Sequence, residues 1–300
     1  MQSYRPPSQN GTLSIVTGTG GLGYEVALAL SRAGGRVILA GRNAKTGAGA
    51  VAAIAAAAPG ADVAFEVLDL ASLRSVRDFA ARLRGSEQAV DRLINNAGVM
   101  SPPRLELTSE GHEVQFGVNY LAHFALTAEL LPLLRARPGA RVVNVTSLAQ
   151  HYAKFDIENL RSEKGYHPGR AYCGSKLLQA MFARELQKRS DAAGWGLTSL
   201  SAHPGFAGTN LFETGGGMSR FVSTRILLPL LGQSASAGSS PILFAATSPE
   251  IDGGALYGPT GFMQMRGAPG PGKYAKIVED QAVRSDVWRR SEDLAGVRYG

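Results

Sequence analysis

Hydrophobic and polar positions alternate between two periods along most of this chain. Short apolar runs rich in β-branched residues are each followed by a longer stretch in which apolar residues recur every three or four positions. This alternation predicts six strands, at 13–16, 36–40, 63–68, 92–95, 141–146 and 197–202. It predicts helices between and after them, at about 22–33, 47–58, 72–83, 110–134, 171–190 and 234–247.

Strands that alternate with helices form β-α-β units, and these build a parallel sheet covered on both faces. We therefore expect an α/β protein with a single doubly wound (Rossmann-type) domain over 12–300 and about seven parallel strands. Residues 1–11 read as a flexible lead-in. The alternation fails after His203, and the mixture of glycines and apolar residues at 205–233 predicts a substrate lid, with an ordinary surface insertion as the alternative. A C-terminal extension covers about 261–300.

Composition narrows the class of protein. Of the 300 residues, 44% are hydrophobic and 18% charged, as in globular proteins with a large core. Cys173 is the only cysteine, so the chain holds no internal disulfide and suits a reducing cytoplasm. The first residues lack the apolar core of a signal peptide, and the longest apolar run, 226–231, is too short for a membrane span. The sequence predicts a cytoplasmic protein.

Charge bears on the partners of the protein. The net charge is +7, but the basic residues are scattered and form no Lys/Arg block. A nucleic-acid surface is therefore not predicted, and a basic enzyme that binds an anionic cofactor fits better. The five histidines form no metal-binding motif with each other or with cysteine, so no metal is expected.

The stretch LSIVTGTGGLGYE, residues 13–25, joins a predicted strand to a predicted helix through glycines. Gly18, Gly20 and Gly23 fit the pattern G-x-G-x-x-G in the context in which it indicates a dinucleotide site. The glycines allow the turn, the approach of backbone to a pyrophosphate, and close packing of helix on strand. The helix start would attract the phosphates. The expected phosphate-binding residues are Gly18, Thr19, Gly20, Gly21, Leu22 and Gly23.

The end of the second strand indicates the choice of cofactor. An acidic residue about 20 positions beyond the glycines would bind the ribose 2′-hydroxyl of NAD. No acid occurs between Arg36 and Thr46, whereas Arg42 ends this strand and Lys45 is near. Because a guanidinium suits a 2′-phosphate, we predict NADP (NADPH) as the cofactor, with NAD less favoured.

Three side chains could move a proton. Tyr172 and Lys176, four residues apart on a predicted helix, share one face, and an ammonium beside a phenol favours the phenolate. The pair could therefore act as general acid or base toward a carbonyl or an alcohol. Ser147 follows the fifth strand, at the sheet edge where such folds bind ligands. Asn96, Ala97 and Gly98 follow the fourth strand at the same edge.

With these residues in view, the chain resembles the short-chain dehydrogenases/reductases. The matching segments stand in the family's order: TGTGGLGYE, LDLASLRSVR, NNAGVM, VNYLAHF, RVVNVTSLAQ, AYCGSKL and HPGFAGTNL. GLGYE, LDLASLRSVR and the 25-residue spacing from Ser147 to Tyr172 are most similar to the retinol dehydrogenase and protochlorophyllide reductase branch. One departure is that the glycine turn is one residue shorter than in that branch, which leaves its shape open.

The resemblance implies a role for each candidate residue. Tyr172 would give the proton, Lys176 would lower the pKa of that phenol and hold the nicotinamide ribose, Ser147 would bind the substrate oxygen, and Asn119 would hold a water that links Lys176 to solvent. Asp69 could instead be a turn residue and Asn119 a helix-kink residue. Further residues implied in the cofactor groove are Asp69, Leu70, Asn95, Asn96, Ala97, Gly98, Tyr172, Lys176, Pro204, Gly205 and Thr209.

We therefore expect an NADPH-dependent oxidoreductase that interconverts a ketone or aldehyde and an alcohol on an apolar small molecule. A second reading is reduction of a carbon–carbon double bond, as in protochlorophyllide reductase. A third, from another class, is a catalytically silent NADP-binding redox sensor. The resemblance also implies a homodimer or homotetramer formed through the helices that hold Asn119 and Tyr172, and a monomer is the alternative.

Overall fold

A computed structural model describes residues 4–162, 164–205 and 234–300, and within them a sheet of eight strands. The strands are β1 (Leu13–Thr17), β2 (Arg36–Gly41), β3 (Val63–Val67), β4 (Arg92–Asn95), β5 (Arg141–Val145), β6 (Thr198–Ala202), β7 (Leu256–Pro259) and β8 (Pro269–Pro271). They lie in the order β3-β2-β1-β4-β5-β6-β7-β8. All neighbours pair in parallel except β7 and β8. The doubly wound parallel sheet is confirmed. The antiparallel edge strand β8 has only three residues, Pro-Gly-Pro, which is too short for a periodic pattern to predict it.

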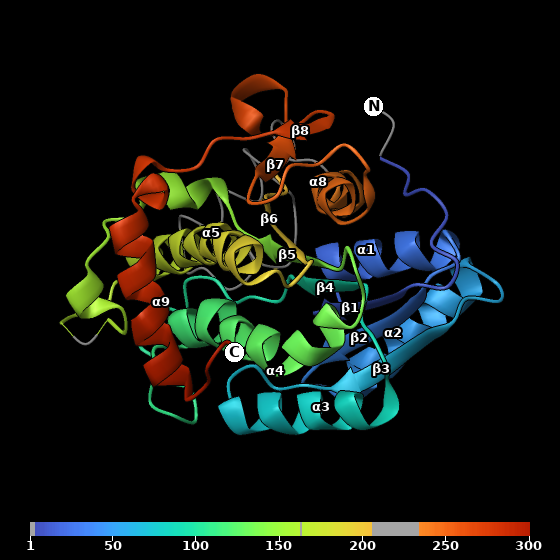
Figure 1. Cartoon of the computed structure of the whole chain (residues 1–300), viewed down its shortest axis with the longest axis horizontal. Coiled ribbons are helices and arrows are strands. Elements are labelled where there is room, and N and C mark those ends of the chain that lie inside the picture. The colour runs from blue at the N-terminus through green and yellow to red at the C-terminus, as the bar shows by residue number, and fades with distance from the viewer. Residues whose placement is uncertain (1–3, 163, 206–233) are drawn as a thin grey trace.

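Helices cover both faces of the sheet (Figure 1). They are α1 (Gly21–Arg32), α2 (Ala44–Ala57), α3 (Leu73–Ser86), α4 (Ala122–Arg135), α5 (Pro168–Ala193), α8 (Ala235–Thr247) and α9 (Gln281–Ala295). The helices α1, α2 and α8 pack on one face, and α3, α4 and α5 on the other. Short helical turns lie at η2 (Leu148–Tyr152), η3 (Ile157–Asn159), η6 (Phe262–Gln264) and η7 (Lys276–Glu279).

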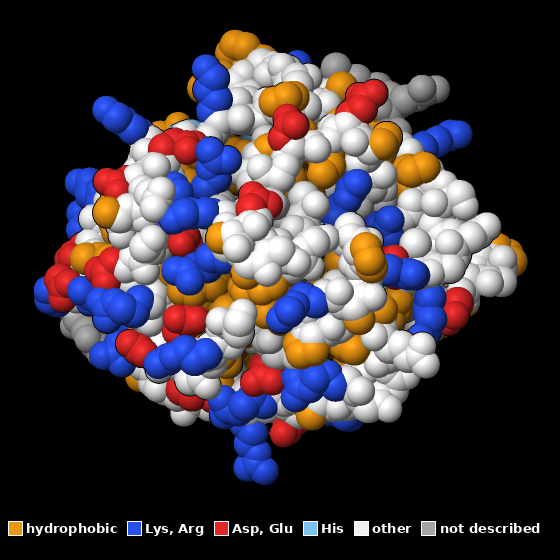
Figure 2. Space-filling view, viewed as in Figure 1, with side chains coloured by type: hydrophobic (Ala, Val, Ile, Leu, Met, Phe, Trp, Pro, Cys, Tyr) orange, Lys and Arg blue, Asp and Glu red, His pale blue; other side chains and the backbone are white. Residues whose placement is uncertain are grey.

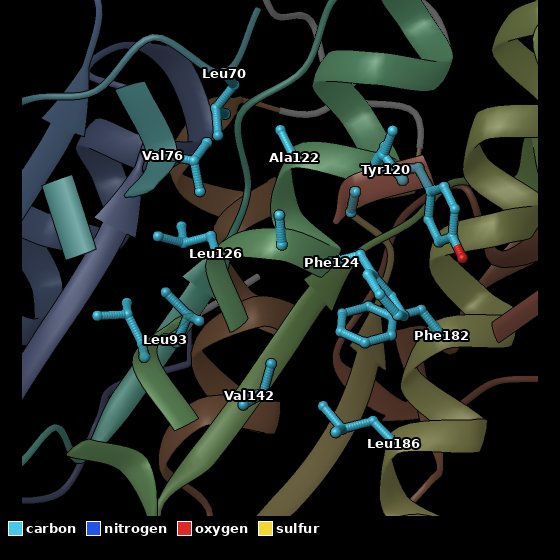
Figure 3. Packing of buried hydrophobic residues seen from close by; sticks show 14 of the residues in the cluster. Leu70, Val76, Leu93, Tyr120, Ala122, Phe124, Leu126, Val142, Phe182 and Leu186 are labelled. Atoms are coloured by element: carbon cyan, nitrogen blue, oxygen red, sulfur yellow. The ribbon is translucent and has the colours of Figure 1, made fainter. Parts of the chain in front are cut away.

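Two hydrophobic cores lie on the two sides of the sheet because successive residues of a strand point to opposite faces. In β1, Ile15 faces the core under α3, α4 and α5, whereas Val16 faces the core under α1, α2 and α8. Figure 3 shows the first of these cores, where Phe124 of α4 lies against Phe182 of α5. The two ring centroids are 5.2 Å apart.

The long helix predicted at 110–134 begins later and differs in its first turns. Glu113 pairs with Leu107 as a β-bridge, and its carboxylate accepts hydrogen bonds from the backbone N–H groups of Gln115 and Phe116. The first turns form a π-helix, η1 (Phe116–Leu121), which leads directly into α4. The wider turn places Asn119 in the buried centre of the molecule. Such π-turns occur often at functional sites.

The C-terminal helix α9 crosses α4 and α5 (Figure 1). Trp288 packs edge-on against Phe124, with ring centroids 4.9 Å apart, and the hydroxyls of Tyr120 and Ser291 are 2.6 Å apart. The buried Glu185 of α5 lies 3.4 Å from the Arg284 guanidinium. Thus α9 packs on the helices through which the sequence suggested a dimer or tetramer, and the oligomeric state stays a prediction.

The lead-in differs from the expectation of a flexible tail. From Tyr4 onward it is packed: the Tyr4 ring lies 5.3 Å from that of Phe244, and the Gln9 N–H donates to the Ala33 carbonyl. The single aromatic residue of this Pro/Ser-rich stretch, Tyr4, makes the ring contact. An isolated residue creates no hydrophobic periodicity, so the sequence pattern could not predict this contact.

Charged side chains of both signs are spread over the surface. Figure 2 shows Lys and Arg interspersed with Asp and Glu on the face in view. Among the described helices, none combines the length and the apolar character that crossing a membrane requires.

Candidate active site

The turn between β1 and α1 has the shape that its glycines predict. Gly18 has a φ of +94°, which L side chains rarely adopt, and a Cβ there would lie 2.9 Å from the Asn96 amide nitrogen. At Gly23 a Cβ would collide with the Gly18 carbonyl, so helix and turn pack in direct contact. No side chain caps the start of α1 and no acid lies in its first turn, whereas the described helices α2, α3, α5, α8 and α9 all have side-chain caps. The N–H groups at the start of α1 therefore have no side-chain acceptor, as at helix starts that bind anions.

A cavity of about 830 Å³ opens beside this turn, at the carboxyl ends of the parallel strands. It brings together predicted cofactor residues from four separate segments of the chain. Those lining it are Gly18, Thr19, Arg42, Asp69, Leu70, Ala97 and Gly98, with Asn43, Thr46, Met100, Pro102, Pro103, Glu106 and Val118 among their neighbours. Gly20, Gly21, Leu22 and Gly23 form the start of α1 and do not line the cavity, and Asn96 lies beside it with its amide donating to the Thr17 carbonyl.

Two expected groove residues have structural partners of their own. Asp69 lines the cavity, but its carboxylate also accepts from the Ala71 N–H at 3.0 Å, as a turn residue does. Asn95 is fully buried and donates to the side chains of Asn144 and Thr127, between β4, β5 and α4. Asn95 therefore faces the core and not the groove, because the alternation along β4 points it away.

Helix α5 places Tyr172 opposite Ser147. His167 caps the helix by accepting from the Arg170 N–H, and Pro168 occupies its first turn. Ser147 follows β5 and caps the short turn η2 by accepting from the Ala149 N–H at 3.2 Å. The Tyr172 phenol lies near the Ser147 side chain, close enough for Ser147 to affect the pKa of the phenol. The sequence prediction that these residues meet at one edge of the sheet is thus supported by their geometry.

Lys176 lies one turn further along α5 and is almost fully buried, with 5% of its surface exposed. Its ammonium donates to the Val145 carbonyl at 2.9 Å and to the Gln179 side-chain oxygen at 2.8 Å. The same nitrogen is 5.8 Å from the centre of the Tyr172 ring. Gln179 was not among the predicted site residues, although its spacing of three from Lys176 on a helix was a usable signal.

Burial dominates the protonation of both groups. It raises the pKa of Tyr172 to about 12, against the smaller, opposing effect of the nearby Ser147 side chain, and it lowers the pKa of Lys176 to about 7. The expectation that the ammonium lowers the phenol's pKa is not met here, because the Lys176 nitrogen is turned toward Val145 and Gln179. At neutral pH Tyr172 therefore keeps its proton and can donate it.

Asn119 is a structural centre of the site. Its side-chain oxygen accepts from the Val99 N–H at 2.7 Å, and its amide donates to the Val99 carbonyl and to the Ser175 hydroxyl. The residue thus holds the segment after β4 against the turn of α5 that carries Tyr172. It also lies in the π-helical turn, so the sequence alternative of a helix-kink residue applies as well.

The remaining predicted residues follow β6. Pro204 and Gly205 directly follow His203, and Gly205, with a φ of +70°, donates its N–H to the His203 ring at 3.2 Å. Thr209 and nearly all of the predicted lid at 205–233 lie outside the described residues. In the described part of the chain, no three His, Cys, Asp or Glu side chains come together as a metal site would need.

Comparisons with known proteins agree with this geometry. The sequence profile of the short chain dehydrogenases matches residues 12–216. Polyprenol dehydrogenase of Mus musculus is 40% identical over 258 residues, which are 83% of this chain and 76% of that protein. Retinol dehydrogenase 13 of Homo sapiens is 38% identical over 293 residues, 96% of this chain and 85% of that protein.

A solved structure covers the whole chain. The crystal structure of an uncharacterized protein from Mycobacterium paratuberculosis matches with a TM-score of 0.81 and 32% identity, and each chain is covered in full. The fold, the order of the motifs and the relatives all indicate the same protein family. The chain belongs to the short-chain dehydrogenase family, in the branch of the retinol dehydrogenases, and its fold is that of a nicotinamide-dependent oxidoreductase.

Proposed function

We propose that the protein is an NADP(H)-dependent oxidoreductase that interconverts a carbonyl group and an alcohol on an apolar small molecule. The observation that carries this proposal is the convergence of Ser147, Tyr172 and Lys176 where the parallel strands end. A hydroxyl, a protonated phenol and a buried amine at one point suit the transfer of a proton to or from an oxygen atom.

The residues of the groove fit a dinucleotide. The uncapped start of α1 would receive the pyrophosphate, and the cavity wall around Asp69, Leu70, Ala97 and Gly98 would receive the adenosine. When bound, the reduced nicotinamide supplies a hydride to the substrate carbon.

Arg42 favours NADP over NAD. It is exposed, lines the cavity and makes no ion pair with any described residue. It stands directly before Asn43, the cap of α2, so the positive end of that helix adds to the attraction for a 2′-phosphate. Glu66 on the neighbouring strand β3 pairs with Arg82 at 3.4 Å and does not compete for Arg42.

The proton steps follow from the positions of three side chains. Ser147 would donate a hydrogen bond to the substrate oxygen and stabilise the negative charge that develops there. Tyr172, protonated at neutral pH, would give its proton to that oxygen during reduction. Lys176, whose pKa burial lowers to about 7 and whose nitrogen is 5.8 Å from the centre of the Tyr172 ring, would return a proton to the phenolate.

The substrate class rests on the relatives. The two relatives described above are named for polyprenol and retinol, which are both long apolar alcohols. We infer that this chain takes an isoprenoid-like or similarly apolar alcohol or aldehyde.

A panel of carbonyl compounds tests the proposal. Retinal, a short polyprenal, an aliphatic ketone and a polar aldehyde would be offered with NADPH and with NADH, and oxidation of the cofactor would be followed by absorbance. We expect turnover of the apolar aldehydes with NADPH, and much slower turnover with NADH. Turnover of only the polar aldehyde, or equal rates with both cofactors, would contradict the proposal.

A further inference from the structure

The buried histidine His123 takes no part in the steps proposed above. It lies in the first turn of α4 with none of its surface exposed. One ring nitrogen, Nδ1, is 2.9 Å from the Asn119 carbonyl oxygen, and the other, Nε2, is 2.9 Å from the Thr17 hydroxyl. Because a carbonyl can only accept, Nδ1 must carry the proton. Nε2 of the neutral ring then accepts the proton of the Thr17 hydroxyl.

This arrangement uses the whole hydrogen-bonding capacity of the Thr17 hydroxyl. Its oxygen accepts from the backbone N–H groups of Asn96 and Ala97, each at 2.9 Å. Its only proton goes to His123, since the other acceptor within reach, the Ile94 carbonyl, is more distant at 3.3 Å. The ring therefore fixes the hydroxyl in the orientation that holds the backbone beside the cofactor groove.

The contact at the other ring nitrogen leads to the catalytic helix. Nδ1 donates to the backbone carbonyl of Asn119, and the side-chain amide of Asn119 donates to the Ser175 hydroxyl at 3.0 Å. Ser175 in turn donates to the Tyr172 carbonyl at 2.8 Å. A path of hydrogen bonds, continued through the covalent frame of Asn119, thus runs from the end of β1, through His123, to the turn of α5 that presents the phenol.

We propose that His123 is a positioning residue that joins the two halves of the site, the backbone of Asn96 and Ala97 at the groove and the helix turn at Tyr172. The inference rests on the function proposed above. Its neutral ring is essential, because a protonated ring would donate from Nε2 and displace the Thr17 proton. Burial lowers the pKa of His123 to about 4, which agrees with a ring that stays neutral.

Two substitutions of His123 distinguish the effect of its two hydrogen bonds from the effect of its side-chain volume. His123→Leu keeps much of the volume and removes both hydrogen bonds, whereas His123→Gln can still offer an oxygen to the Thr17 hydroxyl. Thr17→Val removes the hydroxyl itself, and the double variant His123→Leu/Thr17→Val completes a cycle. Phe124→Leu is the matched control, since Phe124 is equally buried on α4 but packs on Trp288, away from the groove.

The measurements are the NADPH dissociation constant, by fluorescence titration, and kcat with the best apolar aldehyde. For His123→Leu we expect the dissociation constant to rise and kcat to fall, each by about fivefold to tenfold, as for loss of a buried hydrogen bond. His123→Gln should recover most of the NADPH affinity. Thr17→Val should cost less in the His123→Leu background than alone, because both changes break the same path. Phe124→Leu should lower the melting temperature without changing either constant.

Three results would overturn the inference. Unchanged constants in His123→Leu would leave the ring with a packing role only. Strictly additive effects of His123→Leu and Thr17→Val would show that the two residues act independently. If the wild-type protein binds neither NADPH nor NADH, the proposed function itself fails and this inference fails with it, a case that the wild-type titration alone identifies.

Discussion

Replacing Lys176 by methionine should change how the stability of the protein depends on pH. Burial lowers the pKa of Lys176 in the folded protein to about 7, against an ordinary value of 10.5. The unfolded chain therefore holds this proton up to about pH 10, while the folded protein releases it near pH 7. Between these values the unfolded state binds more protons, so the contribution of Lys176 to stability rises with pH.

The size of the effect follows from the shift. Each pH unit within the window is worth about 1.4 kcal/mol for one group. From pH 7.5 to pH 9.5 the wild type should thus gain roughly 3 kcal/mol in free energy of unfolding relative to Lys176→Met. The substitution also removes the bonds to Val145 and Gln179, which changes the absolute difference between the proteins. It does not change the slope with pH, so the slope isolates the titration of Lys176.

Urea unfolding at half-unit steps from pH 7.0 to pH 9.5 measures this slope for wild type and Lys176→Met. Lys188→Met is the control, because Lys188 lies on the same helix but is exposed. We expect the Lys188→Met curve to run parallel to that of the wild type, and the Lys176→Met curve to diverge from it. Parallel curves for all three proteins would refute the conclusion that burial lowers the pKa of Lys176 to about 7.

Three further predictions concern the cofactor, the core and acid stability. Arg42→Ala should weaken the binding of NADPH by about tenfold to a hundredfold, as for loss of a charge-assisted hydrogen bond, and leave the binding of NADH nearly unchanged. An unchanged ratio of the two dissociation constants would contradict the role of Arg42 in cofactor choice. Trp288→Ala should cost about 3–5 kcal/mol in free energy of unfolding because it empties the contact between α9 and α4, and a loss below 1 kcal/mol in urea titrations would contradict that packing. Burial lowers the pKa of both His123 and His203 to about 4. The unfolded chain takes up these protons below about pH 6.5, so the free energy of unfolding should fall as the pH drops from 6.5 to 4. The fall should be less steep in His203→Gln. An equal pH slope in His203→Gln and wild type would contradict the lowered pKa of His203.

The sequence predicted those features that depend on local pattern. The alternation of periods defined the strands β1 to β6, and the glycine spacing defined the turn before α1, because both are set by residues close together in the chain. Tyr172 and Lys176 could be paired for the same reason. Ser147 could be added because the carboxyl ends of parallel strands meet at one edge of the sheet.

Features that depend on distant contacts could not be predicted. The π-turn at Asn119 depends on Glu113 and on a bridge to Leu107, and the anchor of the lead-in depends on Phe244, more than two hundred residues away. The protonation of Tyr172 and Lys176 is set by burial, which their spacing does not reveal. The partners of Lys176 also decide where its charge acts, and only the fold supplies them.

The most direct test of the proposed chemistry is Tyr172→Phe, measured for turnover of the best apolar aldehyde and for NADPH affinity in the same preparation. Phenylalanine keeps the ring and removes the proton that Tyr172 holds at neutral pH. We expect kcat to fall by about a hundredfold to ten-thousandfold, the usual contribution of a general acid. The NADPH dissociation constant should stay within about twofold, because phenylalanine keeps the ring and Tyr172 is not among the residues that line the cavity. Near-full turnover in Tyr172→Phe would show that the proton comes from elsewhere and would contradict the proposed mechanism.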